Sequence, residues 1–417
     1  MDELYVEGGH RLVGELPIHG AKNSVLPLLA ATVLVPQAVT FTNCPSLSDV
    51  DVALAILGNL GCKTRQNGTC ITVDGATLSA VGIPDGLMRQ MRSSIVFLGP
   101  LLARCGEATV SLPGGCELGP RPIDWHLSAL EKLGAQVTES AGRLCVCAPR
   151  GLRGCELSLA FPSVGTTENV LMAASLAKGV TVLHNAAQEP EVADLCRFLN
   201  CCGARITGVG GSRLVVEGVA RLHGCTYRVM PDRMETITYA LAAAVTGGEL
   251  SLVGVDKASL CPTLSVLEEM GCALHCEKRR LSVKAPTRLA CARGVRSMPY
   301  PGFPTDAMAP FMTAACVANG TSVFTETVFE NRYRHVDELR RMGARIRVNG
   351  RVAVVDGDSL HGATVQCTDL RGGAALLLAA LAADGESRLG ALQHLERGYP
   401  AWEDKLRRVG AQLYRIK

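Results

Sequence analysis

Leu339-Arg340-Arg341-Met342-Gly343-Ala344-Arg345-Ile346-Arg347-Val348 changes from one kind of periodicity to another at Gly343. The glycine stands where a helix ends, at the position that favours a left-handed residue. Behind it, Arg345 to Val348 alternates between polar and apolar side chains, which is the period of a β-strand. The segment therefore predicts a helix, a glycine turn and a strand in immediate succession.

The same helix–glycine–strand pattern recurs along the chain, and internal repeats of this kind define an architecture. Each copy reads leucine, two residues, an apolar or small residue, glycine, and alanine or cysteine. Its glycines are about 70 residues apart, at Gly61, Gly134, Gly203, Gly271, Gly343 and Gly410. The whole chain is therefore built from six copies of one unit.

A second helix, rich in alanine and leucine, accompanies each copy, at residues 23–34, 92–103, 168–177, 235–245, 306–318 and 370–383. The pattern predicts a strand–helix–strand–helix–strand unit, and six such units make an α/β protein. A purely structural solenoid is the alternative. Polar residues that occur in one unit and not in its siblings favour a functional site instead.

The two halves of the chain also resemble each other. The segment from Val6 to Gly14 matches the one from Val216 to Gly224. The sixth unit ends at residue 417 without its closing strands, so we expect the N-terminal strands to supply them. The predicted domains are residues 22–229 and residues 1–21 plus 230–417, with three units each and the active site in the cleft between them.

The composition indicates a globular protein with more than one core. Of 417 residues, 47% are hydrophobic and 19% are charged, and the formal net charge is +3. Aromatic residues make up 4%, and no basic tract is interleaved with them, which argues against nucleic-acid binding. The start at Met1-Asp2-Glu3 lacks the basic segment of a secretory signal. The apolar runs are shorter than the roughly 20 residues of a membrane span. We expect a cytoplasmic protein, not associated with a membrane, whose 18 cysteines are mostly reduced.

Two segments suggest anion chemistry. Lys22 precedes the first alanine-rich helix, and a lysine at a helix N-terminus favours an anion site. A solvated lysine in a turn is the alternative. Residues 112–122 place three glycines and three prolines around Cys116, which describes a shaped surface loop. Arg121 in this loop would favour the thiolate form of Cys116, although an incidental loop cysteine is the alternative.

Arginines and one aspartate form the remaining signals. A convergent set of arginines matches an anion with several charged groups; the candidates are Arg92, Arg121, Arg332, Arg371 and Arg397. For any single arginine, a solvated or salt-bridged surface is the alternative. Asp306 stands at the mouth of an apolar helix, either as a cap or as a general base. Cys145 with Cys147, and Cys201 with Cys202, lack the paired spacing of a zinc site. No phosphate loop or HExxH motif occurs, so no metal and no organic cofactor is expected.

Taken together and in this order, the motifs resemble those of the UDP-N-acetylglucosamine 1-carboxyvinyltransferases, a family of enolpyruvyl transferases. The resemblance covers essentially the whole chain. Its motifs are Gly20 to Asn23, Met91 to Ser94, Leu112 to Asp124, Phe161 to Gly165, Pro231 to Arg233, Phe303 to Asp306, Phe329 to Arg332, Asp369 to Arg371 and Glu396 to Tyr399. The resemblance implies an inside-out α/β barrel in each of two domains, in agreement with the six units counted above.

The resemblance also implies a reaction. The 3-hydroxyl group of UDP-N-acetylglucosamine adds to C2 of phosphoenolpyruvate, and phosphate then leaves from a tetrahedral intermediate. This is the first committed step of bacterial peptidoglycan synthesis, and so belongs to cell wall biogenesis, cell shape and cell division. The partners implied are these two small molecules alone, with the protein as a monomer.

Site roles follow from the resemblance by position. Cys116 would be the loop acid and the target of fosfomycin, and Asp306 the base at the sugar hydroxyl. Lys22, Arg121 and Arg397 would hold the phosphate of phosphoenolpyruvate, with Lys22 and Arg397 also counted as catalytic. Arg332, Arg371 and Arg397 would surround its carboxylate. The remaining substrate contacts would be Asn23, Arg92, Arg121, Pro122, Ile123, Asp124, Ser163, Val164, Gly165, Phe329 and Asp369.

Three alternatives stay open. The acceptor could be shikimate 3-phosphate, although the chain lacks the Gly-Asn-Ala-Gly-Thr and Lys-Glu-Ser-Asp-Arg motifs of that enzyme. RNA 3′-phosphate cyclase shares part of the architecture but needs a nucleotidylated histidine. The last alternative is a non-catalytic paralogue that binds the UDP-sugar as a sensor, against which stand the intact Lys22, Cys116, Asp306 and Arg397.

Overall fold

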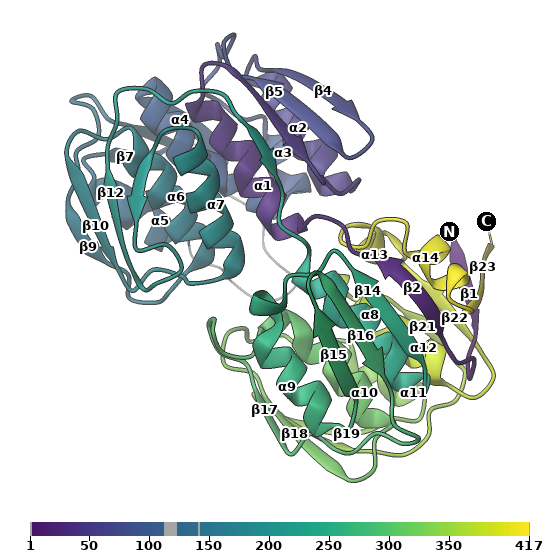
Figure 1. Cartoon of the computed structure of the whole chain (residues 1–417). Helices are drawn as coiled ribbons and strands as arrows, with labels where there is room; N and C mark the ends of the chain where they lie inside the picture. The colour runs from purple at the N-terminus through teal and green to yellow at the C-terminus, as the bar shows by residue number, and fades with distance from the viewer. Residues whose placement is uncertain (1, 112–122, 141, 417) are drawn as a thin grey trace. The chain divides into compact units, whose positions relative to one another are not determined.

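The computed structural model describes residues 2–111, 123–140 and 142–416, and only the backbone of Arg92 and Ser140. These residues form two compact units (Figure 1). The central unit is the described part of residues 20–230. The terminal unit combines the described parts of residues 1–19 and 231–417.

Each compact unit contains three small sheets, which are mixed except for the antiparallel sheet β6-β8-β7. The strand orders of the central unit are β13-β3-β5-β4, β6-β8-β7 and β11-β12-β10-β9. The bounds are β3 Ala38–Thr42, β4 Lys63–Asn67, β5 Cys70–Asp74, β6 Glu107–Ser111, β7 Gln136–Ser140, β8 Arg143–Cys147, β9 Glu156–Ser158, β10 Val180–His184, β11 Arg205–Thr207, β12 Arg213–Glu217 and β13 Thr226–Arg228.

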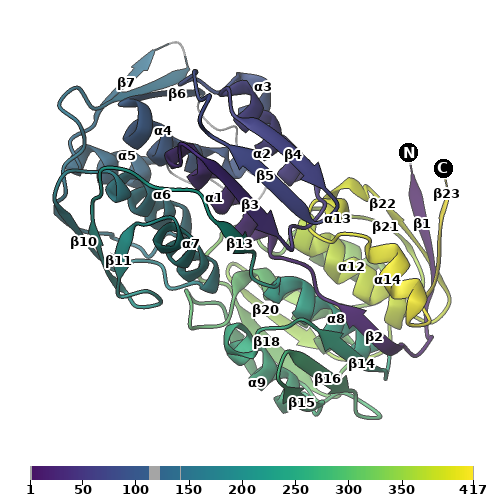
Figure 2. The same ribbon diagram turned by 45° about the horizontal axis from the view of Figure 1, so that its top comes forward.

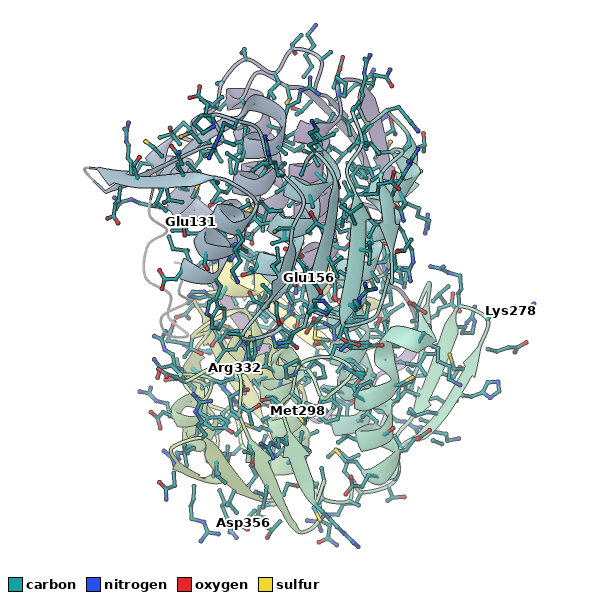
Figure 3. All side chains as sticks on the ribbon, turned by 90° about the vertical axis from the view of Figure 1, so that its left-hand side faces the viewer. Glu131, Glu156, Lys278, Met298, Arg332 and Asp356 are labelled. Atoms are coloured by element: carbon teal, nitrogen blue, oxygen red, sulfur yellow. The ribbon has the colours of Figure 1, made fainter. Side chains whose placement is uncertain are left out.

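The terminal unit repeats this plan in the orders β15-β16-β14-β2, β17-β18-β20-β19 and β21-β22-β1-β23. Its strands are β1 Glu3–Glu7, β2 Val13–Pro17, β14 Glu249–Val253, β15 Ala273–Glu277, β16 Arg280–Lys284, β17 Gly294–Arg296, β18 Thr321–Thr325, β19 Arg345–Asn349, β20 Val352–Asp356, β21 Thr364–Gln366, β22 Glu386–Gly390 and β23 Gln412–Ile416. Figure 3 shows Lys278 at the tip of the β15–β16 hairpin, pointing away from the ribbon.

The helices of the central unit are α1 Lys22–Ala31, α2 Ser48–Asn59, α3 Asp85–Gln90, α4 Leu98–Cys105, α5 Asp124–Lys132, α6 Val164–Ser175 and α7 Pro190–Cys201, with 3-10 turns η1 Thr32–Leu34 and η2 Arg92–Phe97. Those of the terminal unit are α8 Arg233–Val245, α9 Cys261–Glu269, α10 Met308–Cys316, α11 Val336–Arg341, α12 Leu370–Ala382, α13 Gln393–Glu396 and α14 Trp402–Arg408, with η3 Lys257–Leu260 and η4 Thr305–Ala307.

The alanine-rich helices lie inside, and the sheets lie outside. In the terminal unit α8, α10 and α12 pack against one another, and they are buried on nearly every side. A helix that is apolar all round belongs in a core. Most strands instead alternate between buried and more exposed residues, as Thr321–Thr325 does. The predicted α/β architecture, with helices inside and sheets outside, is confirmed.

Most of the six sequence repeats have one strand more than the sequence predicted. After the helix-ending glycine the chain forms an antiparallel hairpin, for example β19 with β20, where the prediction had one strand. The left-handed glycine itself is confirmed in all six copies, because φ lies between +91° and +107° at Gly61, Gly134, Gly203, Gly271, Gly343 and Gly410.

The N-terminal strands complete sheets of the terminal unit, as predicted. β1 pairs antiparallel with both β22 and β23, in the position that β20 has between β18 and β19. β2 pairs parallel with β14, just as β13 pairs parallel with β3 in the central unit. The echo between the two halves of the sequence therefore marks equivalent strands.

Candidate active site

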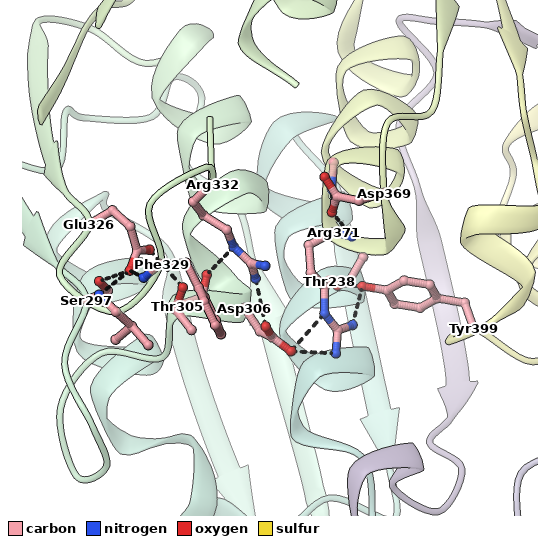
Figure 4. Close-up of polar contacts among 12 residues, drawn as sticks. Thr238, Ser297, Thr305, Asp306, Glu326, Phe329, Arg332, Asp369, Arg371 and Tyr399 are labelled. Carbon is pink, nitrogen blue, oxygen red and sulfur yellow. Dashed lines mark hydrogen bonds and ion pairs between the residues drawn. The ribbon is translucent and has the colours of Figure 1, made fainter. Parts of the chain in front are cut away.

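Asp306 of η4 forms ion pairs with two arginines (Figure 4). These three residues are the densest cluster of charges among the predicted site residues. Arg332 donates from Nη2 to Oδ1 at 2.7 Å, and Arg371 donates from Nη2 and Nε to Oδ2 at 2.9 and 3.1 Å. The arginine side chains are 3% and 6% exposed, whereas that of Asp306 is 29% exposed. The carboxylate is therefore the accessible part of the cluster.

The charges of this trio are fixed at neutral pH. Burial raises the pKa of Asp306, but the guanidinium groups of Arg371 and Arg332 outweigh burial and hold this pKa well below its usual range. Asp306 in turn outweighs the effect of burial on Arg371 and raises its pKa. One carboxylate between two guanidinium groups leaves a net positive charge, which suits an anionic ligand. The N-cap residues of η4 and α10 are Pro304 and Ala307, so Asp306 does not hold the cap position that the sequence suggested.

A second set of contacts positions the side chain and the backbone of Arg371. Its Nη1 donates to the hydroxyl of Tyr399 at 3.0 Å, and that hydroxyl is 2.9 Å from Oγ1 of Thr238. Asp369 caps α12 by accepting the N–H groups of Arg371 and Gly372 at 2.9 and 3.0 Å. A Cβ at residue 372 would stand 2.5 Å from Oγ1 of Thr368. Glycine at residue 372 therefore avoids a clash with the side chain of Thr368, which lies just before the helix.

Arg332 is held through residues that the sequence analysis missed. Its Nε donates to the carbonyl of Thr305 at 3.2 Å. The hydroxyl of Thr305 donates to Oε2 of Glu326 at 2.7 Å. Oε1 of this buried carboxylate also accepts the hydroxyl of Ser297 and the N–H groups of residues 328 and 329, at 2.7 to 3.0 Å. The available signal in the sequence was a glutamate directly after the strand of residues 321–325.

Two other predicted residues of the terminal unit, Phe329 and Asp369, contact this cluster, and a third, Arg397, lies nearby in the sequence. The guanidinium carbon of Arg332 is 5.7 Å from the centroid of the Phe329 ring. Arg397 is half-buried at the end of α13, two residues before Tyr399. Asp369 is the α12 cap described above. The structure thus groups Asp306, Phe329, Arg332, Asp369 and Arg371, and Arg397 precedes Tyr399 by two residues.

Lys22 opens α1 of the central unit and is buried. Its Nζ lies 2.5 Å from Oδ2 of Asp49, at the start of α2. The interpretation of Lys22 as a solvated turn residue is therefore wrong. Asn23 is exposed beside it. Ser24, one residue further, donates its hydroxyl to Oδ2 of Asp194 on α7 at 2.5 Å.

A second group in the central unit lies where α5 and α6 begin. Ile123 and Asp124 open α5, and Ser163, Val164 and Gly165 open α6, where the Ser163 hydroxyl accepts the N–H of residue 166 at 3.4 Å. A Cβ at residue 165 would stand 3.1 Å from the ring of His126. The two helix starts are therefore adjacent.

His126 links these two helices to the core. Its Nδ1 lies 2.8 Å from Nδ2 of Asn169 on α6, and the ring is buried. Burial lowers the pKa of His126 to about 4. The imidazole is therefore neutral at pH 7 and accepts the amide hydrogen of Asn169.

Cys116, Arg121, Pro122 and the side chain of Arg92 lie outside the described residues. Within the described residues there is no group of three or more His, Cys, Asp or Glu side chains placed to hold a metal ion. In the same part of the chain, the helices are all too short or too polar to cross a membrane.

Comparison with known families gives a match over residues 6–406 to EPSP synthase (3-phosphoshikimate 1-carboxyvinyltransferase). UDP-N-acetylglucosamine 1-carboxyvinyltransferase of Zymomonas mobilis is 50% identical over 425 residues, and UDP-N-acetylglucosamine 1-carboxyvinyltransferase 2 of Caldanaerobacter subterraneus is 47% identical over 417 residues. Both alignments cover 100% of this chain and 100% of the relative.

A solved structure extends the similarity to three dimensions. The enolpyruvyl transferase NikO from Streptomyces tendae has a TM-score of 0.91 and 26% identity to this chain. The match covers 100% of this chain and 99% of that one.

Proposed function

The chain belongs to the EPSP synthase family of carboxyvinyltransferases, and from this membership we propose that it transfers the enolpyruvyl group of phosphoenolpyruvate to the 3-hydroxyl group of UDP-N-acetylglucosamine and releases phosphate. The observation that carries the proposal is similarity of 47–50% identity along the entire length of relatives with that activity in their names. The cluster around Asp306 supplies the matching chemistry.

Asp306 is proposed as the base that takes the proton of the sugar 3-hydroxyl. In the described structure Arg332 and Arg371 hold its pKa too low for a good base. The carboxylate of phosphoenolpyruvate, bound to the same guanidinium groups, would share their charge and raise the proton affinity of Asp306. The base would thus become effective only when the second substrate is in place.

The reaction then proceeds by addition and elimination. The sugar oxygen bonds to C2 of phosphoenolpyruvate while C3 gains a proton. C3 next loses a proton as the bond from C2 to the phosphate oxygen breaks. Cys116 is proposed as the acid of this sequence, and Lys22, Arg121 and Arg397 as the groups that hold the phosphate. The substrates bring about five negative charges, which these cations would compensate.

The nucleotide sugar is assigned to the group of residues in the central unit where α5 and α6 begin. Asn23, Arg92 and residues 121–124 are proposed as contacts, together with Ser163, Val164 and Gly165 at the start of α6. Backbone N–H groups at a helix start suit a diphosphate. Phe329 is proposed near the uracil, and Asp369 near the substrates through its contact with Arg371.

This reaction would make the protein the enzyme of the first committed step of peptidoglycan synthesis, with roles in cell wall biogenesis, cell shape and division. We propose that it works in the cytoplasm as a monomer, and that fosfomycin alkylates Cys116. Cys116→Ser should abolish this alkylation and most product formation, and leave UDP-sugar binding nearly unchanged. Loss of UDP-sugar affinity with turnover unchanged would remove Cys116 from its proposed role.

Phosphate release from phosphoenolpyruvate tests the reaction and its acceptor together. Release is expected with UDP-N-acetylglucosamine and not without it. Release only with shikimate 3-phosphate would keep the family reaction and change the acceptor. Binding of the UDP-sugar without any release would identify a non-catalytic sensor instead of an enzyme.

A further inference from the structure

Two cysteines of the central unit are in contact at a place that the proposed reaction does not use. Cys202 follows the last residue of α7, and Cys225 precedes β13; their Sγ atoms are 3.5 Å apart. Cys202 is buried, Cys225 is half-buried, and the neighbouring Cys201 is exposed. Figure 2 shows α7 and β13 next to each other in this unit, and the hydroxyl of Tyr227 joins them by donating to Asp194 at 2.7 Å.

The backbone holds the two thiols in this position. The N–H of His223 donates to the carbonyl of Cys202 at 2.9 Å, and the N–H of Thr40 on β3 donates to the carbonyl of Cys225 at 3.0 Å. Glycines permit the close approach. A Cβ at residue 224 would stand 2.1 Å from the carbonyl oxygen of residue 38, and Gly203 has φ of +96° with its Cβ position 3.0 Å from the ring of His223.

The two thiols differ in chemistry. Hydrogen bonding from Cys202 lowers the pKa of Cys225, burial opposes this, and Cys201 and His223 lower the pKa further. The same contact, together with burial, raises the pKa of Cys202. Among the described cysteines with a shifted pKa, Cys225 alone has it lowered. A thiolate beside a neutral thiol is the arrangement of a nucleophile and a resolving cysteine.

We propose that Cys202 and Cys225 form a modifiable dithiol that a hydroperoxide oxidises to a disulfide. The Cys225 sulfur attacks the peroxide oxygen, the O–O bond breaks, and a sulfenic acid and water form with hydrogen peroxide as oxidant. The Cys202 sulfur then displaces hydroxide from this sulfenic acid, which leaves as a second water. Two thiols lose two electrons in total, and one peroxide gains them. The proposal does not depend on the proposed transferase activity.

The disulfide would close a loop over residues 203–224, which includes the β11–β12 hairpin, and would join α7 to the segment leading into β13. A cross-link constrains the unfolded chain more than the folded one. Oxidation is therefore expected to raise the Tm of the folded protein by a few degrees, and a thiol reductant should reverse the change.

The test is oxidation of the full folded chain with about one equivalent of hydrogen peroxide, followed by alkylation and peptide mapping without reduction. A cross-link between the peptides of residues 201–202 and 225 is expected before other described cysteines are oxidised. No protease cuts between the adjacent Cys201 and Cys202, so variants must separate them. The cross-link should persist in Cys201→Ser, the matched control, and vanish in Cys202→Ser and Cys225→Ser.

A trapping reagent for sulfenic acid gives a second measurement on the same samples. It should label Cys225 in Cys202→Ser and label little in the unmodified protein, where the disulfide forms instead. A cross-link that survives in Cys202→Ser would assign the pair to Cys201 and overturn the proposal. So would oxidation of exposed cysteines such as Cys145 or Cys261 ahead of any cross-link.

Discussion

At the scale of single residues, Asp306 combines accessibility with fixed charge. Its two arginine partners are nearly buried, so their positions depend on the protein and not on solvent. The sequence predicted Asp306, Arg332 and Arg371 as separate site residues. It left a helix cap open as the alternative for Asp306 and a salt-bridged surface as the alternative for each arginine. Only the three-dimensional structure shows that the two arginines share one carboxylate, because Arg371 comes from a different repeat than Asp306 and Arg332.

Asp306→Asn should lower kcat by about 10²- to 10⁴-fold, because an amide cannot accept the proton of the sugar hydroxyl. UDP-sugar affinity, measured by calorimetry, should change much less. Asp358→Asn is the matched control, since this aspartate pairs with Arg345 on the surface of the same unit at 2.6 Å. Equal losses of affinity and kcat in Asp306→Asn would indicate a structural role.

Glu326 is a positioning residue in the same cluster. Glu326→Gln keeps one acceptor oxygen but turns an amide toward the Thr305 hydroxyl, which donates to Oε2 in the native protein. The change should lower kcat about tenfold, the effect of losing roughly one charged hydrogen bond, with UDP-sugar affinity nearly constant.

A double-mutant cycle checks this assignment. Thr305→Val removes the donor of the same hydrogen bond, so it should reproduce the loss in kcat. The double variant should then be no slower than either single variant. Losses that simply multiply would show that Glu326 and Thr305 act independently. The sequence could not have revealed which groups Glu326 binds, because its donors come from three separate segments.

At the scale of elements, the helix-ending glycines are the best-predicted feature of the fold. Each is left-handed because only glycine adopts that conformation without steric cost. The shortest strands were harder to predict. β9, β13 and β17 have three residues each, too few to establish an alternating pattern.

Two glycines at the end of α2 offer a matched pair. Gly61 has φ of +95°, and a Cβ there would stand 2.5 Å from Oγ of Ser79. Gly58 lies inside the helix with nothing within 4 Å of its Cβ position. Gly61→Ala should cost about 1–2 kcal/mol or more of unfolding free energy. Gly58→Ala should be neutral or stabilise by up to about 1 kcal/mol. Urea denaturation measures the change in unfolding free energy for both substitutions. Equal effects would contradict the assignment of Gly61 as the left-handed residue that ends the helix.

At the scale of the whole molecule, each unit contains a buried histidine that cannot easily take up a proton. His126 of the central unit accepts a hydrogen bond from Asn169. His335 of the terminal unit is fully buried, and neither of its ring nitrogens has a hydrogen-bond partner. Burial lowers the pKa of both. Protonation would therefore favour the unfolded chain in either unit.

The pH dependence follows from the sign of these shifts. Unfolded histidine binds a proton below about pH 6.5, whereas folded His126 does so only below about 4. Stability is therefore full above pH 6.5 and falls as the pH decreases toward 4, by roughly 3 kcal/mol for this residue. In His126→Gln the dependence of unfolding free energy on pH should be shallower. His275→Gln, at an exposed position of β15, is the control. An unchanged slope in His126→Gln would refute the assignment.

The position of β1 between β22 and β23 affects how the chain folds during its synthesis. β1 is translated well before its partner strands, because Glu7 pairs with Gln412 and Glu386, which leave the ribosome about 400 residues later. At 5–20 residues per second this interval is roughly 20–80 s. The central unit is continuous and can fold meanwhile. An unpaired β1, with Leu4 and Val6 that are later fully buried, must remain in solution for that time. β1 is thus exposed to aggregation and chaperone binding until both β22 and β23 have been made.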